Sequence, residues 1–113
     1  MDARLPTQLW VKARLALWNK TGFPAVLRRR GDQYGGTIIL CVDRLDGTAD
    51  VLGQQRSIEG VLSWVRLGAG TPMTSEEERA YIERAAARDR DVWVIGVEAL
   101  SGWPPLDEPV DAD

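Results

Sequence analysis

A continuous apolar run at residues 37–42, Thr-Ile-Ile-Leu-Cys-Val, is the feature that most constrains how this chain can fold. Gly35 and Gly36 precede the run, and turn-forming residues that include Asp46 and Gly47 follow it. An apolar run of this length between turn residues is typical of a strand that is covered on both faces. We therefore expect it to form the central strand of a sheet on which the other segments pair or pack.

Residues 5–21 predict a first helix, because apolar residues recur there at helical spacing. The members of one apolar stripe are Leu9, Trp10, Ala13, Ala16 and Leu17. Three further apolar residues widen this stripe beyond that of a simple two-sided helix, namely Val11, Leu15 and Trp18. The helix is therefore expected either to be deeply embedded or to present one flank to something else.

The remaining segments predict four more strands and a second helix. Strands are expected at residues 25–30, 48–52, 61–67 and 91–99, with Asp46-Gly47 as a hairpin turn before the second of these. Thr74 and Glu77 match a capping box at the start of the second helix. The element order α-β-β-β-β-α-β predicts an α+β fold with a mainly antiparallel sheet of about five strands and two helices.

Chain length and composition predict one domain. The chain has 113 residues, of which 44% are hydrophobic, so it can bury a core without disulfides or metal. We expect the domain to span residues 1–100, followed by a Pro- and Asp-rich tail at residues 101–113 without regular structure. The chain has one cysteine, its N-terminal residues lack a signal-peptide pattern, and no apolar stretch is long enough to span a membrane. These observations predict a cytoplasmic protein that does not associate with a membrane.

Charge and residue types narrow the classes of function. Net charge is −3, which argues against a dedicated nucleic-acid binder. Histidine is absent, so the commonest general base and metal ligand are both missing. Cys41 lies within the expected central strand, where burial disfavours a reactive thiolate, and it is expected to be a core residue. These features favour a protein that is not an enzyme and needs no cofactor.

Several short patterns stand out along the chain: Arg4-Leu5, Trp10-Val11, Val26-Leu27-Arg28-Arg29, Gly31-Asp32, Leu45-Asp46-Gly47, Ala80-Tyr81-Ile82 and Asp91-Val92-Trp93-Val94-Ile95. In these patterns the chain resembles a family of alphaproteobacterial proteins, domain-of-unknown-function family 1491. The resemblance covers nearly the full chain except the tail. It implies a bacterial cytosolic protein, and it carries no known activity and no catalytic residues.

One candidate site is a basic strand end next to a glycine-containing loop. Arg28, Arg29 and Arg30 precede the loop at residues 31–36, which contains Gly35 and Gly36. Guanidinium groups together with backbone N–H groups can hold a small anion or a nucleotide phosphate. The alternative interpretation is a solvated strand end, because charge runs usually lie on exposed faces.

Asp43, Asp46 and Asp50 crowd the expected hairpin and suggest a metal site, but their spacing does not match the EF-hand pattern. A hairpin turn already explains Asp46-Gly47 completely. Among the acidic residues, the run at 76–78 is explained by the N-terminal end of a helix. No metal ligand set is therefore predicted.

The chain has five tryptophans, which are useful in interfaces. Trp64 and Trp93 fit strand patterns and are expected in the core. Partner contact is predicted at Trp18, on the widened helix, and at Trp103, Pro104 and Pro105, an extended segment carrying an apolar anchor. The alternative for Trp103 is a tail that folds back onto its own domain.

These features predict a non-catalytic protein-interaction or assembly module, with a protein partner or a second copy of the chain. The alternative is a small anion- or nucleotide-binding domain that uses the arginines and the glycine loop. The sequence does not identify the partner or the ligand.

Overall fold

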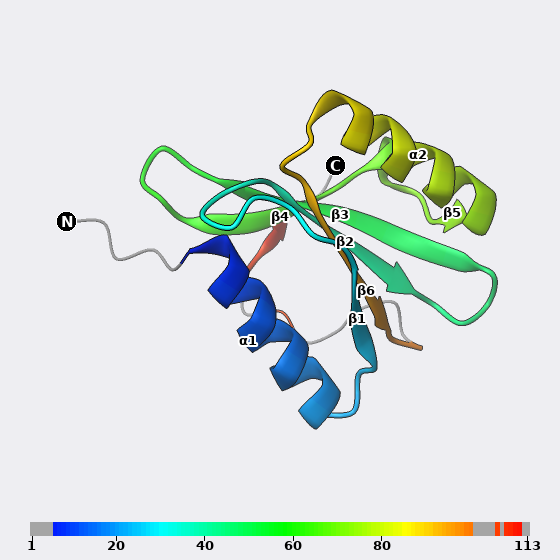
Figure 1. Cartoon of the computed structure of the whole chain (residues 1–113). Coiled ribbons are helices and arrows are strands. Elements are labelled where there is room, and N and C mark those ends of the chain that lie inside the picture. Colours follow the sequence, from blue (N-terminus) through cyan, green and yellow to red (C-terminus); the bar gives the residue numbers. More distant parts are fainter. Residues whose placement is uncertain (1–5, 101–105, 107, 112–113) are drawn as a thin grey trace.

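A central mixed sheet with one helix on each face forms the architecture of the protein (Figure 1). The computed structural model describes residues 6–100, 106 and 108–111. In chain order the elements are α1 (Thr7–Lys20), β1 (Ala25–Arg29), β2 (Ile38–Asp43), β3 (Thr48–Arg56), β4 (Leu62–Arg66), a 3₁₀ turn η1 (Gly68–Gly70), β5 (Met73–Thr74), α2 (Ser75–Arg88), β6 (Trp93–Glu98) and β7 (Val110–Asp111). The predicted α+β class with two helices is confirmed over these residues.

The sheet has seven strands in the described part of the chain, in the order β1-β6-β2-β3-β4-β7, with β5 paired to β3. Strands β2 and β6 run parallel, as do β4 and β7, while the other pairs are antiparallel. The prediction of a mainly antiparallel sheet of about five strands was therefore wrong in both respects. α2 provides a crossover that inserts β6 between β1 and β2, and β5 and β7 are too short to leave a sequence pattern.

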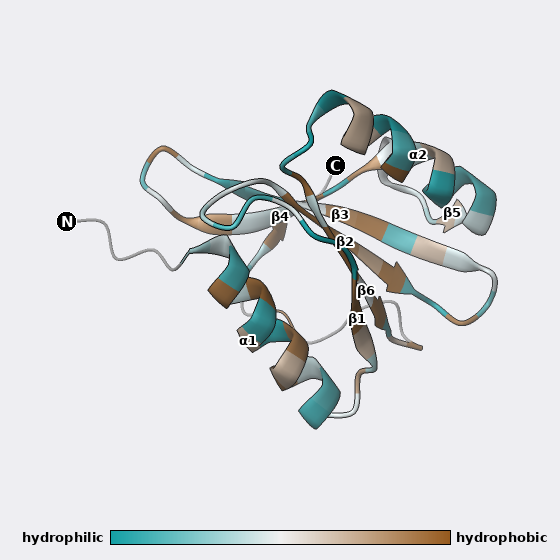
Figure 2. Cartoon of the chain, viewed as in Figure 1, coloured by the Kyte–Doolittle hydropathy of each residue, from teal (hydrophilic) through white to brown (hydrophobic). Residues whose placement is uncertain are grey.

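The central strand β2 is covered on both faces, as the apolar run predicts (Figure 2). Its alternate side chains enter two separate cores because successive residues of a strand point to opposite faces. Leu40 and Val42 pack on the α1 side, with Trp64 and Trp93. Ile39 and Cys41 pack on the α2 side. The predicted core positions of Cys41, Trp64 and Trp93 are therefore confirmed.

Helix α1 buries a different face from the predicted stripe. Val11, Arg14 and Trp18 are buried, whereas Leu9 and Leu17 are 51% and 47% exposed. Of the predicted stripe, only Trp10 packs against the core, whereas the other four residues are exposed, because the helix turns Val11, Arg14 and Trp18 toward the sheet instead. The flank with Leu9 and Leu17 is exposed, and that this flank meets something else stays a prediction.

Local turn and cap signals match the structure. Thr74 and Glu77 form the predicted capping box, in which Thr74 Oγ1 accepts from Glu77 N–H and Glu77 Oε1 accepts from Thr74 N–H. Gly47 has a φ of 89° in the β2–β3 hairpin, a conformation that favours glycine. Neither helix, in the part of the chain that the structure describes, is long and apolar enough to cross a membrane.

Glu108 of the C-terminal segment forms a largely buried ion pair with Arg14 of α1. The Arg14 guanidinium donates to both carboxylate oxygens, at 2.8 Å and 3.3 Å, and Trp64 Nε1 donates to Oε1 at 3.1 Å. The same guanidinium lies 4.4 Å from the ring centre of Trp10 and 5.5 Å from that of Trp18. Beyond this contact the chain pairs with β4 as β7, although its composition predicts irregular structure.

Candidate functional site

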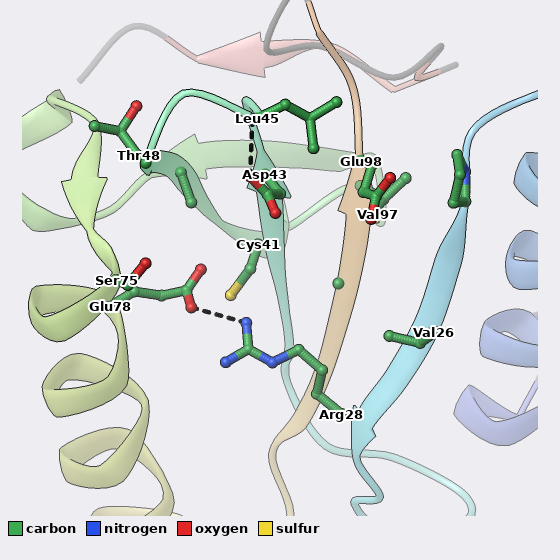
Figure 3. Close-up of a pocket in the computed structure, with 14 residues that line it drawn as sticks. Val26, Arg28, Cys41, Asp43, Leu45, Thr48, Ser75, Glu78, Val97 and Glu98 are labelled. Carbon is green, nitrogen blue, oxygen red and sulfur yellow. Dashed lines mark hydrogen bonds and ion pairs between the residues drawn. The ribbon is translucent and has the colours of Figure 1, made fainter.

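A groove of about 410 Å³ lies on the α2 side of the sheet, next to the first turn of that helix (Figure 3). Residues from β1, β2, β3 and β6 form its floor and sides, and Ser75 and Glu78 of α2 form one wall. Small residues on neighbouring strands make the floor, namely Cys41, Ala49 and Gly96. Because these side chains fill little space and α2 does not cover them all, the sheet surface is hollow here.

An ion pair crosses one end of the groove. Arg28 of β1 reaches over β6, and its Nη1 lies 2.9 Å from Glu78 Oε1. Gly96 makes this path possible, since a Cβ at position 96 would lie 2.9 Å from Arg28 Cδ. Burial acts to lower the pKa of Arg28, but the nearby Cys41 and the hydrogen bond and charge of Glu78 outweigh it, so the pKa is raised. This guanidinium therefore remains charged and paired.

Cys41 lies on the groove floor beneath that ion pair (Figure 3). Burial raises the pKa of its thiol to about 12, and the charge of Glu78 acts in the same direction. Arg28 acts in the opposite direction, but with a smaller effect. Since the thiolate is the nucleophilic form, the raised pKa and the burial of Cys41 disfavour its reaction at neutral pH.

Two carboxylates line the other end of the groove. Asp43 and Glu98 lie opposite each other in the parallel register of β2 and β6, and both are exposed. Asp43 Oδ1 accepts from Leu45 N–H at 2.8 Å. Within the residues that the structure describes, neither carboxylate lies within 4 Å of a basic group as an ion pair. Like charges opposite each other on neighbouring strands are unfavourable, so a cation bound between Asp43 and Glu98 would relieve their repulsion.

The rim beside these carboxylates is apolar. Val26 is 61% exposed and Leu45 is 53% exposed, and both line the groove (Figure 3). Leu45 has a φ of 63°, an uncommon conformation for a residue with a side chain. The turn therefore holds a leucine at the mouth of the groove, next to Asp43.

The structure does not bring the three arginines of the predicted anion site together. Arg28 pairs with Glu78 in the groove, whereas Arg29 donates to backbone carbonyls of Arg90 and Val92. The Arg30 guanidinium lies 5.8 Å from the ring centre of Trp93. These contacts place the three guanidinium groups at separate locations, so they do not form one anion-binding cluster.

The glycine loop already contains an anionic group of its own. The Asp32 carboxylate accepts from the N–H groups of Tyr34 and Gly35, at 3.2 Å and 2.8 Å. A Cβ at Gly36 would clash with the carbonyl oxygen of Asp91, which gives this glycine a packing role. The geometry therefore does not support an anion site at Gly35 and Gly36.

Of the predicted partner contacts, Trp18 is completely buried in the core on the α1 side. A partner could not reach this side chain in the folded protein, so Trp18 does not belong to a docking surface. Trp103, Pro104 and Pro105 lie outside the described residues.

The hairpin aspartates serve separate structural roles. Asp46 accepts hydrogen bonds from Thr48, and Asp50 pairs with Arg44 at 2.8 Å. No three acidic or cysteine side chains converge closely enough to hold a metal ion among the described residues.

Sequence reasoning missed the groove carboxylates Glu78 and Glu98. The sequence explains Glu78 by its place at the N-terminal end of a helix, whereas in the structure it also pairs with Arg28, 50 residues earlier in the chain. The pairing of Asp43 with Glu98 depends on the parallel register of β2 and β6. Neither relation leaves a local signal in the sequence.

Comparison with known proteins identifies the family. A crystal structure at 1.87 Å of a DUF1491 family protein from Caulobacter crescentus CB15 is similar, with a TM-score of 0.83 and 32% identity, covering 96% of this chain and all of that one. An NMR structure of a DUF1491 family protein from the same organism has a TM-score of 0.80 and 32% identity, covering 97% and 99% of the two chains. A solution structure of a protein from A. tumefaciens shares the fold, with a TM-score of 0.70 and 24% identity over 85% of this chain and 86% of that one.

No curated protein matches the chain. The family model described as "Protein of unknown function (DUF1491)" matches residues 5–107. This match covers most of the sequence, and the first two structures agree with it in fold and identity. The chain therefore belongs to the DUF1491 family.

Proposed function

We propose that this protein is a non-catalytic interaction module whose groove holds a basic side chain of a partner protein. The observation that carries the proposal is the pair of exposed carboxylates, Asp43 and Glu98, beside an apolar rim and without a described ion-pair partner. A lysine or arginine side chain combines a long apolar stem with a cationic end. This combination matches the two features of the groove.

A lysine or arginine side chain of the partner can fill the groove from its rim inward. The aliphatic stem of the guest side chain packs against Val26 and Leu45, and its cationic end lies between Asp43 and Glu98. A carboxylate accepts strong charge-assisted hydrogen bonds from an ammonium or guanidinium group. The volume of about 410 Å³ is ample for one such side chain together with part of its backbone.

Catalysis is a poorer account of the same groove. The Cys41 thiol has a pKa of about 12 and is buried. Glu78 is paired with Arg28, and the chain contains no histidine to act as a general base. The groove thus offers charge and shape for binding but no activated nucleophile or base.

A reducing compartment suits this module, since its free Cys41 thiol is part of the core. We therefore place its activity in the cytoplasm. A fractionation of its own cells that recovers the protein only outside the cytoplasm would contradict this location.

The binding proposal can be tested by NMR with a minimal probe. N-acetyl-lysine methylamide is titrated into ¹⁵N-labelled protein, and the uncharged norleucine analogue serves as the matched ligand. We expect saturable shifts at the amides of residues 41–45 and 96–98 with the lysine probe only. The double variant Asp43→Asn/Glu98→Gln should bind about fivefold or more weakly, because two charge pairs are removed.

Glu83→Gln provides the matched control, since Glu83 is an exposed acid on α2 outside the groove. It should leave the affinity for the lysine probe unchanged. Equal affinities of the lysine and norleucine probes, or an unchanged affinity in the Asp43/Glu98 variant, would refute the proposed site.

A further inference from the structure

The outward flank of α1 is an apolar surface that the domain does not cover. Leu9 and Leu17 are about half exposed, and Ala13 and Ala16 between them are also exposed. These residues recur at spacings of three and four, so they share one side of the helix. The opposite side of α1 is buried against the sheet through Val11 and Trp18.

The solvent-exposed charges of helix α1 itself all have one sign. Helix α1 contains no acidic residue, and Lys12 and Lys20 are exposed beside the leucines. Residues 6–31 as a whole contain six basic residues and no acidic one, although the complete chain has 14 basic and 17 acidic residues. Arg14 and Arg28 are neutralised by Glu108 and Glu78. The two lysines are therefore the charges on α1 that are turned toward solvent.

We propose that this flank docks an acidic amphipathic helix of a partner protein. The surface is separate from the groove, because α1 and α2 cover opposite faces of the sheet (Figure 1). The inference is independent of the groove proposal, so either can fail without the other.

The arrangement of side chains suits a helix as the occupant. Ala13 and Ala16 have small side chains and lie between the larger side chains of Leu9 and Leu17. An apolar side chain of a second helix can therefore pack over the alanines, between the two leucines. Glutamates flanking that apolar stripe would meet Lys12 and Lys20 at the rim. The leucines supply the buried centre, and the lysines select the charge of the partner.

Other occupants match the surface less well. A second copy of α1 would bring lysines to an interface that has no acidic residue on either helix. A nucleic acid would use the lysines but would leave the leucines in water. An anionic membrane would receive only two leucines from a helix of 14 residues.

The test uses NMR titration with a designed acidic peptide helix, about 18 residues long, with a leucine stripe flanked by glutamates. A matched peptide has lysine at every glutamate position. We expect the acidic peptide to shift amides of α1 and the basic peptide to leave them unchanged. Lys12→Glu/Lys20→Glu should weaken binding about five- to tenfold, and Leu17→Ser about tenfold.

Arg84→Glu is the matched charge control, because Arg84 is exposed on α2, on the other face of the sheet. It should bind the acidic peptide like the parent protein, and thermal melts should be unchanged for all these surface variants. Equal affinity for the two peptides would overturn the proposal. So would α1 shifts with a single-stranded RNA or phosphatidylglycerol vesicles but none with the acidic peptide, or a dimer that Leu17→Ser dissociates.

Discussion

Replacing Glu108 with glutamine should destabilise the whole domain, although Glu108 lies in the C-terminal segment. The substitution keeps the size and shape of the side chain but removes its charge. Arg14 would then remain beneath the segment without a carboxylate partner. The side chains of Arg14 and Glu108 are only 10% and 14% exposed, so water can replace little of the lost interaction.

The size of the effect follows from this burial. Removing one partner of a buried ion pair costs about 3–5 kcal/mol, because the other charge is left uncompensated. The glutamine carbonyl can still accept a hydrogen bond from Arg14 or Trp64, which retains about 1 kcal/mol. We therefore expect the free energy of unfolding to fall by about 2–4 kcal/mol. At about 4 °C per kcal/mol, Tm should fall by roughly 8–16 °C.

Urea denaturation at pH 7, followed by tryptophan fluorescence, measures this loss directly. Glu83→Gln, an exposed change of the same chemistry, should shift the free energy by less than about 0.5 kcal/mol. The double variant Arg14→Met/Glu108→Leu should recover part of the stability, since an apolar pair has no unpaired charge, while Trp64 Nε1 still loses its acceptor. A Glu108→Gln protein with the stability of the parent would refute the role assigned to this ion pair.

Two further predictions concern titration and reactivity. Burial acts to raise the pKa of Glu108, but hydrogen bonds from Arg14 and Trp64 and the charge of Arg14 outweigh it, so the pKa lies below its ordinary value of 4.5. The stability that this carboxylate adds is therefore present above pH 4.5 and is lost as pH falls through the lower, folded-state pKa. Denaturation at a series of pH values should show the gap between parent and Glu108→Gln closing at acid pH, whereas a constant gap would contradict the linkage. Cys41, whose thiol pKa is about 12, should resist a thiol reagent at pH 8 in the native protein and react fully in denaturant, and rapid native labelling would contradict its burial.

Features with a local signal could be predicted from the sequence. The apolar run at residues 37–42 identified β2, because only a strand buried on both faces places consecutive apolar residues in two cores. The capping box of Thr74 and Glu77 is completed within four residues and fixed the start of α2. In these cases neighbouring residues alone determine the structure.

Features that depend on tertiary placement could not be predicted in this way. The parallel pairing of β2 with β6 follows from the path of α2, and it decides that Asp43 faces Glu98. The buried face of α1 includes Arg14, which is apolar only in its stem and is tolerated there because Glu108 meets it. Hydrophobic periodicity counts only apolar residues, so it expects the face that contains Arg14 to be exposed. It therefore predicts that the stripe with Leu9 and Leu17 is buried, whereas both leucines are about half exposed.

The Arg14–Glu108 ion pair and β7 determine how the C-terminal segment should be studied. If the segment were an irregular tail, deleting residues 101–113 would be a direct test of whether Trp103 contacts a partner. The deletion would also remove Glu108 and β7, and would leave Arg14 unpaired beneath them. A loss of binding in the deleted protein would then report unfolding as readily as a lost contact. Point substitution at Trp103, with Glu108 retained and the free energy of unfolding measured in parallel, separates the two effects.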